Sequence, residues 1–395
     1  MKRILLVVFV MILFLPLIAQ AADGNSKQKK RKGKRIVATK SVDCNSRKLS
    51  KKAKQACSAR IARAVAEARR RAEEARRRAI ARAIAAENAL RKTAADNISR
   101  DITDGEDLVI RKAVVDAIGN NAATAVVMET QTGKIITIVN QDWAIRKSFS
   151  PCSTIKLVTT VAGLNEDVID EEDQVSQDDL EKALARSKNG YFGLIGSKVG
   201  YDEFRKVATT LGLGKPTGIN APGESPGKLS FVRKTGLVYS HGYGIEMTPL
   251  QQAVMVSIIA NHGKKVTPYI PKKTEKDPVT IPKTEQINLP VKDLDGAIPG
   301  MKGAAEYGTA HRGVDYLQGV AGKTGTCSAT GTFTSVAPIS NPKYTVVVIT
   351  RGNAGKGKYA AAIVGKIYHF LLGKGTTILP PNETKNMESA IVIPK

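Results

Sequence analysis

Residues 58–97 form an uninterrupted stretch in which Ala, Arg and Glu predominate and neither Gly nor Pro occurs. Because these residues are strong helix formers, the stretch predicts one helix that ends near residue 100 and spans roughly 60 Å. Weakly apolar side chains recur every three or four residues and give a narrow stripe beside a row of arginines. Such a stripe suits a coiled coil or a solvated spacer, and its small side chains favour the spacer.

The positive charge of the chain is concentrated in the same region. The net charge of the 395 residues is +25, and residues 23–100 carry 25 Lys and Arg against 7 Asp and Glu, a net of +18. Residues 101–395 carry 34 basic and 29 acidic side chains, a net of only +5, as in an ordinary globular domain. Residues 22–57 are too polar to bury a core, so they are expected to form a disordered basic arm.

The N-terminus has the features of an export signal. Lys2 and Arg3 precede the apolar run Ile4–Ala19, and Ala19-Gln20-Ala21 fits the small-x-small pattern of a signal-peptidase site. We therefore expect a signal peptide at residues 1–21 and a periplasmic or other extracytoplasmic location. An uncleaved anchor is the alternative, although the run is shorter than the roughly 20 apolar residues of a spanning helix.

Export limits the partners of the basic region. Nucleic acid is not expected outside the cytoplasm, whereas anionic wall polymers or a membrane surface would be attracted by the charge of residues 22–100. A solvated helix that binds nothing explains the same composition equally well. Export also places Cys44, Cys57, Cys152 and Cys327 in an oxidising compartment, where they can form two disulfides in three possible pairings.

Residues 101–375 alternate helix and strand patterns, which predict a mixed α/β domain followed by a tail at 376–395. Near the start of the domain, Asp104 can cap a helix that ends at Gly119. Strand patterns near both ends of the domain predict a sheet that joins its N- and C-terminal parts. The strand patterns are at residues 124–128, 135–139 and 344–350, and the final helix pattern is at residues 359–372.

Three short strings in this domain carry the residue types of a nucleophilic active site. In Ser153-Thr154-Ile155-Lys156, which follows Pro151 and opens a predicted helix, the lysine lies one turn after the serine. An amine at that spacing can take the proton of the hydroxyl and so make the serine a nucleophile. Backbone N–H groups at a helix start can also stabilise an oxyanion.

The other two strings supply polar and cationic groups. Ser187-Lys188-Asn189 places a hydroxyl and an amide at the end of a predicted helix, where they can pass a proton and hold a substrate amide. In Lys323-Thr324-Gly325-Thr326 the glycine lets a ligand approach a predicted strand, while the lysine and hydroxyls face anionic groups. A second Lys-Thr-Gly at Lys234 competes with it. The four histidines show no paired metal-ligand spacing, so no metal site is expected.

In this order the strings resemble the active-site set of penicillin-binding proteins and serine β-lactamases. Residues 183–189 and 242–251 resemble the corresponding stretches of penicillin-binding transpeptidase domains, and the second stretch holds Thr248 and Gln251 at the spacing of a capping box. Lys323, and not the earlier Lys-Thr-Gly, follows these stretches as the family's strand motif does.

The resemblance covers roughly residues 120–375. It implies an α/β (α+β) transpeptidase fold with an antiparallel sheet flanked by helices and an all-helical subdomain, here preceded by the long basic helix. It also implies a serine D,D-transpeptidase that acts on the D-Ala-D-Ala stem peptides of peptidoglycan, needs no cofactor and is acylated by β-lactams. The implied catalytic residues are Ser153, Lys156, Ser187 and Lys323, and the implied substrate-binding residues are Asn189, Thr324, Gly325 and Thr326.

The sequence departs from the family at Cys152, which stands where a Gly usually precedes the nucleophile. Cys152 adjoins Ser153, and Cys327 adjoins Thr326; the backbone N–H groups of this serine and this threonine form the implied oxyanion hole. A similar cysteine pair is bridged in carbapenem-hydrolysing β-lactamases. The resemblance therefore implies a Cys152–Cys327 disulfide and a separate Cys44–Cys57 pair, with buried free thiols as the alternative.

Three other functions fit the sequence less well. A serine β-lactamase shares the motifs, but the Glu-x-x-Leu-Asn string that supplies a deacylating base in one large class is absent between Asn189 and Lys323. A D,D-carboxypeptidase would use the same residues with water as the acceptor. The third is a non-catalytic penicillin-binding sensor or wall-binding scaffold, and the intact Ser153, Lys156 and Lys323 argue against it.

Overall fold

The computed structural model describes residue 44 and residues 49–169, 177–229, 236–271, 282–315 and 317–373. The expected signal peptide, most of the basic arm, the tail at 376–395 and the competing Lys234 lie outside these residues. The chain divides into two compact units, Met1–Arg76 and Arg77–Lys395, and the division falls within the long helix.

The elements of the described residues are, in chain order, α1 (Lys51–Ile98), α2 (Leu108–Ile118), β1 (Ala123–Glu129), β2 (Ile135–Val139), the π-helix η1 (Asp142–Arg146), the 3-10 helix η2 (Cys152–Ile155), α3 (Lys156–Asn165), α4 (Gln177–Ala185), α5 (Asn189–Val199), α6 (Tyr201–Thr210), β3 (Lys228–Leu229), α7 (Leu237–His241), β4 (Ile245–Glu246), α8 (Pro249–Ala260), β5 (Lys264–Val266), β6 (Thr284–Gln286), α9 (Val291–Asp295), α10 (Ile298–Glu306), α11 (His311–Val314), β7 (Ala321–Cys327), β8 (Thr330–Ala337), β9 (Tyr344–Arg351), the 3-10 helix η3 (Gly352–Ala354) and α12 (Gly357–Leu371).

The long helix predicted from the sequence is α1, and it begins at Lys51, earlier than the expected Ser58. Good helix formers fill the additional turns, and the Ser50 hydroxyl accepts the Ala53 N–H at 3.3 Å as an N-cap. Most side chains of the part of α1 in the first unit are exposed. The expected Cys44–Cys57 disulfide joins the second turn of α1 to the preceding residues, with the Cα atoms 5.6 Å apart.

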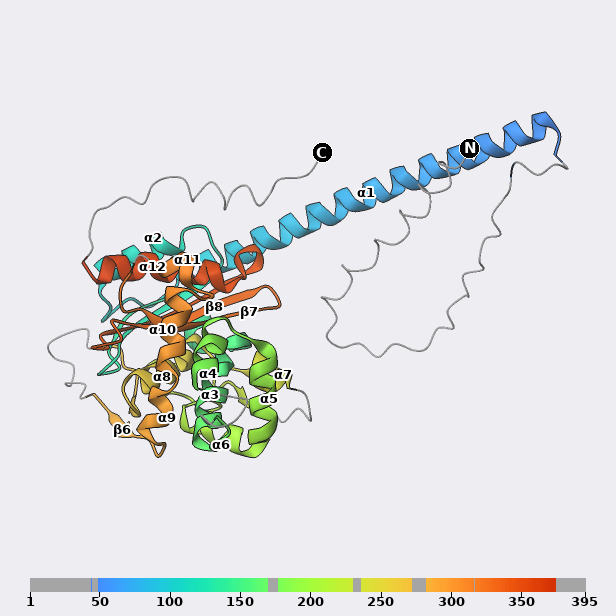
Figure 1. The fold of residues 1–395 in the computed structure, drawn as a ribbon. Coiled ribbons are helices and arrows are strands. Elements are labelled where there is room, and N and C mark those ends of the chain that lie inside the picture. Colours follow the sequence, from blue (N-terminus) through green and yellow to red (C-terminus); the bar gives the residue numbers. More distant parts are fainter. Residues whose placement is uncertain are drawn as a thin grey trace. The chain divides into compact units, whose positions relative to one another are not determined.

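The second unit contains a five-stranded antiparallel sheet with the order β2-β1-β9-β8-β7. Its strands β8 and β7 are labelled in Figure 1. The predicted hairpin is β1–β2, and the predicted strand near the C-terminus is the central β9. Because β1 pairs with β9, the sheet joins the N- and C-terminal parts of the domain, as the sequence pattern indicated. Among the described strands β7 pairs with β8 alone, so it forms one edge of this sheet.

Helices cover both faces of the sheet. Along β1, Ala125 and Val127 pack with residues of α2 and α12, whereas Val126 and Met128 pack with residues of α8, as the two-residue period of a strand requires. Every residue of α8 is buried, because the helix contributes to the core under the sheet and also to the core of the helical part. The expected capping box is present at its N-terminus.

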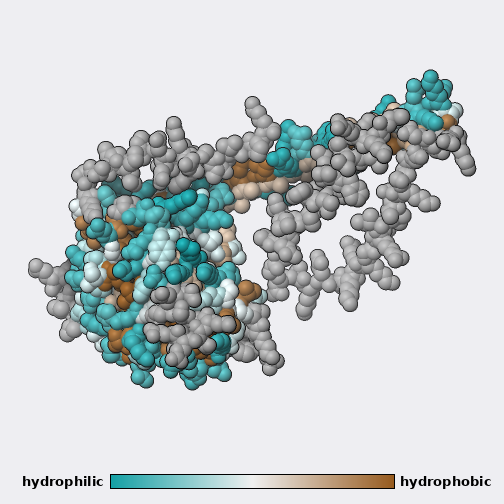
Figure 2. Space-filling model, in the orientation of Figure 1, coloured by the Kyte–Doolittle hydropathy of each residue, from teal (hydrophilic) through white to brown (hydrophobic). Residues whose placement is uncertain are grey.

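A second core is formed by helices α3–α7, α9 and α10, which together make the expected all-helical subdomain (Figure 1). On the face drawn in Figure 2, hydrophilic residues predominate and hydrophobic residues lie among them in small groups. None of the helices in the described part of the chain has the length and apolar character needed to cross a membrane.

The cap of α2 differs from the prediction. Asp107, and not Asp104, is the N-cap, and its carboxylate accepts the N–H groups of Val109 and Ile110, both at 2.9 Å. Asp107 immediately precedes the first helical residue, whereas Asp104 lies in the turn before it, one turn too early to reach these donors. The helix is followed by Gly119, as expected.

Candidate active site

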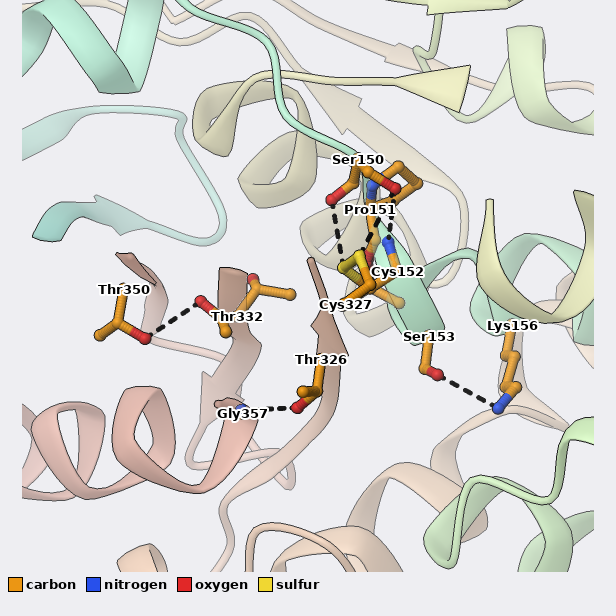
Figure 3. Close-up of a disulfide and its surroundings, with 12 residues drawn as sticks. Ser150, Pro151, Cys152, Ser153, Lys156, Thr326, Cys327, Thr332, Thr350 and Gly357 are labelled. Carbon is orange, nitrogen blue, oxygen red and sulfur yellow. Dashed lines mark hydrogen bonds between the residues drawn. A yellow bond between two sulfur atoms is a disulfide. The ribbon is translucent and has the colours of Figure 1, made fainter. Parts of the chain in front are cut away.

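Ser153 lies in the helical run that leads into the helical subdomain. The 3-10 helix η2 contains Ser153 and continues directly into α3, which begins at Lys156. This geometry places the two side chains one turn apart and facing each other, and Lys156 Nζ lies 3.2 Å from Ser153 Oγ (Figure 3). The sequence spacing therefore produces the predicted pair of a hydroxyl and an amine.

Lys156 connects the first string to the second. Its Nζ lies 2.8 Å from both the carbonyl oxygen and Oγ of Ser187, and 2.6 Å from Oδ1 of Asn189. In its neutral form the amine can donate its two N–H groups to the Ser187 carbonyl and to Asn189 Oδ1, and its lone pair can accept a hydrogen bond from a serine hydroxyl. Burial lowers the pKa of Lys156 to about 7, which makes the neutral amine abundant at neutral pH.

Ser187 and Asn189 reach Lys156 from the junction of α4 and α5. Ser187 has a φ of 57°, a left-handed conformation that a residue other than glycine adopts at a cost. In this conformation both its carbonyl and its hydroxyl contact the same amine. Asn189 is the first residue of α5. The structure thus brings together four of the predicted residues, and two of them, Ser187 and Asn189, lie 31 and 33 positions from Lys156 along the chain.

The third string is on β7, at the edge of the sheet, as predicted. Lys323 is fully buried, and its Nζ donates to the Thr324 carbonyl at 3.0 Å. Burial and, to a smaller extent, the charge of Lys156 hold the pKa of Lys323 well below its usual range. A Cβ on Gly325 would lie 2.9 Å from the Pro151 carbonyl and 3.1 Å from Cys152 Cβ, so only glycine allows β7 to approach η2 this closely.

The Cys152–Cys327 disulfide fastens η2 to β7, and both expected disulfides are thereby present. Its Cα atoms are 5.6 Å apart, and the Ser150 hydroxyl lies 3.6 Å from Cys327 Sγ (Figure 3). Cys152 has a φ of 52°, a left-handed conformation that glycine adopts without strain. The left-handed conformation gives a physical reason for the glycine that the family usually has at this position. Cys152 adopts the same conformation, and its disulfide links it to β7.

A cleft of about 400 Å³ opens between these elements. Four of its lining residues were not assigned a role from the sequence: Thr309, Lys356, Gly357 and Lys358. Thr309 shares a hydrogen bond with the Thr324 hydroxyl, and the Gly357 N–H donates to Thr326 Oγ1 at 2.8 Å. The predicted residues that line the cleft are Ser153, Ser187, Asn189, Thr324 and Thr326, whereas Lys156, Lys323 and Gly325 lie behind its surface.

A larger cleft of about 660 Å³ lies near Glu129, Lys134 and Lys343, and neither serine nor cysteine lines it. It therefore lacks a candidate nucleophile, whereas Ser153 lines the smaller cleft. Within the described ranges, no group of three or more His, Cys, Asp or Glu side chains is placed to hold a metal ion.

Comparison with known proteins agrees with this geometry. The family described as "Penicillin binding protein transpeptidase domain" matches residues 123–369, which is more than half of the chain. The chain belongs to this family. All three strings and every residue named above as lining the 400 Å³ cleft fall within the matched part of this penicillin-binding transpeptidase domain.

Curated relatives are distant and longer. Penicillin-binding protein PbpB of Mycolicibacterium smegmatis is 24% identical over 340 residues, which cover 68% of this chain and 52% of that protein. Peptidoglycan D,D-transpeptidase MrdA of Acinetobacter baumannii is 24% identical over 306 residues, with 62% and 45% covered. Stage V sporulation protein D of Bacillus subtilis is 27% identical over 279 residues, with 58% and 43% covered. The chain thus spans about half the length of the curated relatives it matches.

Solved structures share the fold. The crystal structure of Pseudomonas aeruginosa PBP2 in complex with WCK 5153 matches with a TM-score of 0.61 at 21% identity, covering 70% of this chain and 80% of that one. A structure of penicillin binding protein 3 from Mycobacterium tuberculosis, complexed with aztreonam, matches with a TM-score of 0.57 at 19% identity, covering 69% and 78%. The predicted fold class, a transpeptidase fold with an antiparallel sheet and a helical subdomain, is confirmed.

Proposed function

We propose that the protein is an exported serine D,D-transpeptidase that cross-links peptidoglycan stem peptides and is covalently acylated by β-lactams. The observation that carries this proposal is the position of Lys156 Nζ, which contacts both Ser153 Oγ and Ser187 Oγ in a buried site. One amine can therefore take a proton from the nucleophile and return it through a second hydroxyl. The relatives named as D,D-transpeptidases support the choice of reaction.

In the acylation step, neutral Lys156 accepts the Ser153 proton while Oγ attacks the carbonyl carbon of the penultimate D-Ala. The backbone N–H groups of Ser153 and Thr326 stabilise the oxyanion. As the C–N bond breaks, Ser187 gives its proton to the departing nitrogen and receives one from Lys156, which becomes neutral again. The terminal D-Ala leaves as a free amine, and the acyl group remains on Ser153. A β-lactam follows the same step, but its leaving nitrogen stays attached through the opened ring.

The groups around the Ser153–Lys156 pair bind the substrate. Thr324 and Thr326 receive the terminal carboxylate of the stem peptide, and Asn189 holds its amide. The outer edge of β7 suits an extended peptide, because an edge strand presents backbone donors and acceptors to a ligand strand. Buried Lys323 adds a cationic or polar group behind the hydroxyls, and Gly325 keeps β7 close to the nucleophile. No cofactor takes part in these steps.

Transfer of the acyl group to an amine of a second stem peptide completes cross-linking. Transfer to water would make the protein a D,D-carboxypeptidase, and rapid transfer to water after penicillin acylation would make it a β-lactamase. The absence of Glu-x-x-Leu-Asn between Asn189 and Lys323 favours slow hydrolysis. The buried Lys156 with its lowered pKa favours a catalyst over an inert sensor or scaffold, since a purely structural core would not need it.

Labelling of the purified chain with a fluorescent penicillin tests the proposal. Stable label is the expected result, whereas rapid release would indicate a β-lactamase and absence of label would indicate a scaffold. Ser153→Ala should abolish labelling without unfolding the protein, and persistent label in that variant would refute the assignment. Lys156→Ala should slow labelling roughly a hundredfold or more, as expected for loss of a general base. Lys234→Ala serves as the control for the strand motif and should label at the normal rate.

The basic half of α1 suits an anionic surface outside the cytoplasm. Six arginines of the first unit are exposed on it: Arg60, Arg63, Arg69, Arg70, Arg71 and Arg76. Binding of the full chain to isolated cell wall or anionic vesicles should weaken steeply with salt, because the Debye length is only about 8 Å at physiological ionic strength. A variant with these six arginines changed to Gln is the control. Equal binding by both proteins at low salt would leave α1 as a spacer.

A further inference from the structure

One wall of the catalytic cleft is a glycine-rich loop, residues 352–357, between β9 and α12. The loop ends at Gly357, whose N–H donates to Thr326 Oγ1 at 2.8 Å. A Cβ on Gly357 would lie 2.9 Å from both the Gly325 carbonyl oxygen and Thr324 Cβ, so the loop lies directly against β7. Its position therefore affects the hydroxyls to which we assign the substrate carboxylate.

The opposite side of this loop is held by α1. The Glu87 carboxylate accepts the backbone N–H of Asn353 at 2.9 Å. The Glu87 side chain is only 9% exposed, whereas that of Glu67 on the same helix is 51% exposed. Gly352 has a φ of 69°, and a Cβ there would overlap Glu87 Oε2 and lie 2.9 Å from Leu90 Cδ2. The loop can therefore approach α1 this closely only with glycine at position 352.

The same end of α1 also belongs to a hydrophobic cluster near the segment that precedes Ser153. Ala94, with Leu90 against it, shares a hydrophobic cluster with Trp143 and Phe149. Phe149 is four residues before Ser153. The last turns of α1 thus share a hydrophobic cluster with the segment that leads to Ser153, and they hydrogen-bond to the loop that borders the cleft.

We propose that Glu87 is a positioning residue for the catalytic cleft: by accepting the Asn353 N–H it fixes the 352–357 loop against β7 and so sets the site for the substrate carboxylate. This inference rests on the proposed function. Glu87 does not contact the Ser153–Lys156 pair, so its loss should weaken binding of the ligand carboxylate and leave the chemical step unchanged. A hydrogen bond to a carboxylate contributes enough for a roughly tenfold effect on binding.

The test compares Glu87→Ala with Glu87→Gln in the full chain. The glutamine keeps a carbonyl oxygen for the Asn353 N–H, so it should restore the normal behaviour, whereas alanine removes the acceptor. Glu74→Ala, at an exposed position of the same helix, is the matched control. Arg91→Ala removes the ion pair that Glu87 makes at 3.0 Å but keeps the Asn353 contact, so it should also behave normally.

Two readouts are measured. Acylation kinetics with a penicillin and with its methyl ester should show about tenfold weaker binding of the acid by Glu87→Ala, less than a twofold change for the ester, and an unchanged maximal rate. Amide hydrogen exchange of residues 352–357 should be faster in Glu87→Ala than in wild type or Glu87→Gln. Gly352→Ala, whose Cβ would overlap Glu87 and displace the loop from α1, should reproduce both effects.

Several results would overturn the inference. Equal losses for acid and ester would mean a general loss of structure, and equal impairment of Glu87→Gln would mean that charge, rather than the hydrogen bond, matters. Unchanged exchange of the loop in Glu87→Ala would refute the contact as its support. If wild type is not acylated, the proposed function fails, but loop exchange still decides whether Glu87 fixes the loop.

Discussion

The protonation of Lys156 should determine how acylation depends on pH. Only the neutral amine can accept the Ser153 proton, and burial lowers the pKa of Lys156 to about 7. About half of the molecules are then competent at pH 7, about one in eleven at pH 6 and about ten in eleven at pH 8. The second-order rate constant for acylation should therefore rise about tenfold from pH 6 to pH 8 and then level off.

A lysine with its ordinary pKa of 10.5 would give a different curve. The neutral fraction would rise about a hundredfold between pH 6 and pH 8 and would not level off until above pH 10. The measurement is the rate of labelling by a fluorescent penicillin below saturation, from about pH 5.5 to pH 9.5, with Ser153→Ala as the blank. Unfolding at each pH is checked separately, so that loss of structure is not mistaken for protonation.

Two neighbouring groups could contribute to such a curve. Burial and the nearby Lys156 charge lower the pKa of His241, and the same two causes hold the pKa of Lys323 well below its usual range. His241→Gln should keep the midpoint near pH 7 if Lys156 is the titrating base. A logarithmic slope of one that continues past pH 9, or a midpoint that disappears in His241→Gln, would refute the assignment to Lys156.

Three further predictions concern stability and the geometry of the cleft. The pKa of Lys156 is lower in the folded than in the unfolded protein, so protonation of this lysine favours unfolding, and its cost to stability grows as pH falls from the unfolded pKa of 10.5 toward 7. The free energy of unfolding of wild type, measured relative to Lys156→Met by denaturant titration, should therefore rise by about 2 kcal/mol from pH 7 to pH 9. Replacing the Cys152–Cys327 pair by serines should slow penicillin labelling and lower the free energy of unfolding by up to about 5 kcal/mol, because the bridge spans 175 positions. The same change at Cys44–Cys57 should leave labelling unchanged, and equal labelling by both variants would contradict a role for the Cys152–Cys327 bridge in the cleft. Gly325→Ala should destabilise the protein by about 1–3 kcal/mol and slow labelling, because the added Cβ would lie 2.7 Å from Thr332 Cγ2. A variant as stable and as reactive as wild type would show that β7 can shift to accept the extra atom.

The elements that sequence patterns predicted well are those with a strong local signal. The β1–β2 hairpin, the buried strand β9 and the C-terminal helix α12 follow from runs of apolar residues, and α8 follows from its capping box and Pro249. The candidate catalytic residues were identified because three strings occur in a family order. Their convergence was not visible in any one string, since Lys156 meets Ser187 and Asn189 across 31 and 33 positions.

The remaining parts of the cleft depend on packing between distant segments. Lys356 and Gly357 border the cleft only because the loop before α12 lies against β7, a contact with no local signal beyond alternating Gly and Lys. The exposure of Ile61, 41%, agrees with the solvated spacer favoured from the sequence, but the burial of the charged Glu87, 9% exposed, was not predicted. Periodicity identifies a stripe but does not say which part of a long helix has a partner to pack against.

The two strained residues of the cleft show how its geometry is maintained. Cys152 and Ser187 both adopt left-handed backbone conformations, which cost roughly 1–2 kcal/mol each for residues other than glycine. The Cys152–Cys327 bridge stabilises the first, and two hydrogen bonds from Lys156 to Ser187 stabilise the second. Burying Lys156 itself opposes folding below its unfolded pKa. Each unfavourable feature therefore lies beside the compensating contact. Each contact also involves or adjoins a residue to which we assign a catalytic role, so the interactions that hold the strained backbone in place also fix the proposed nucleophile Ser153 and its neighbours.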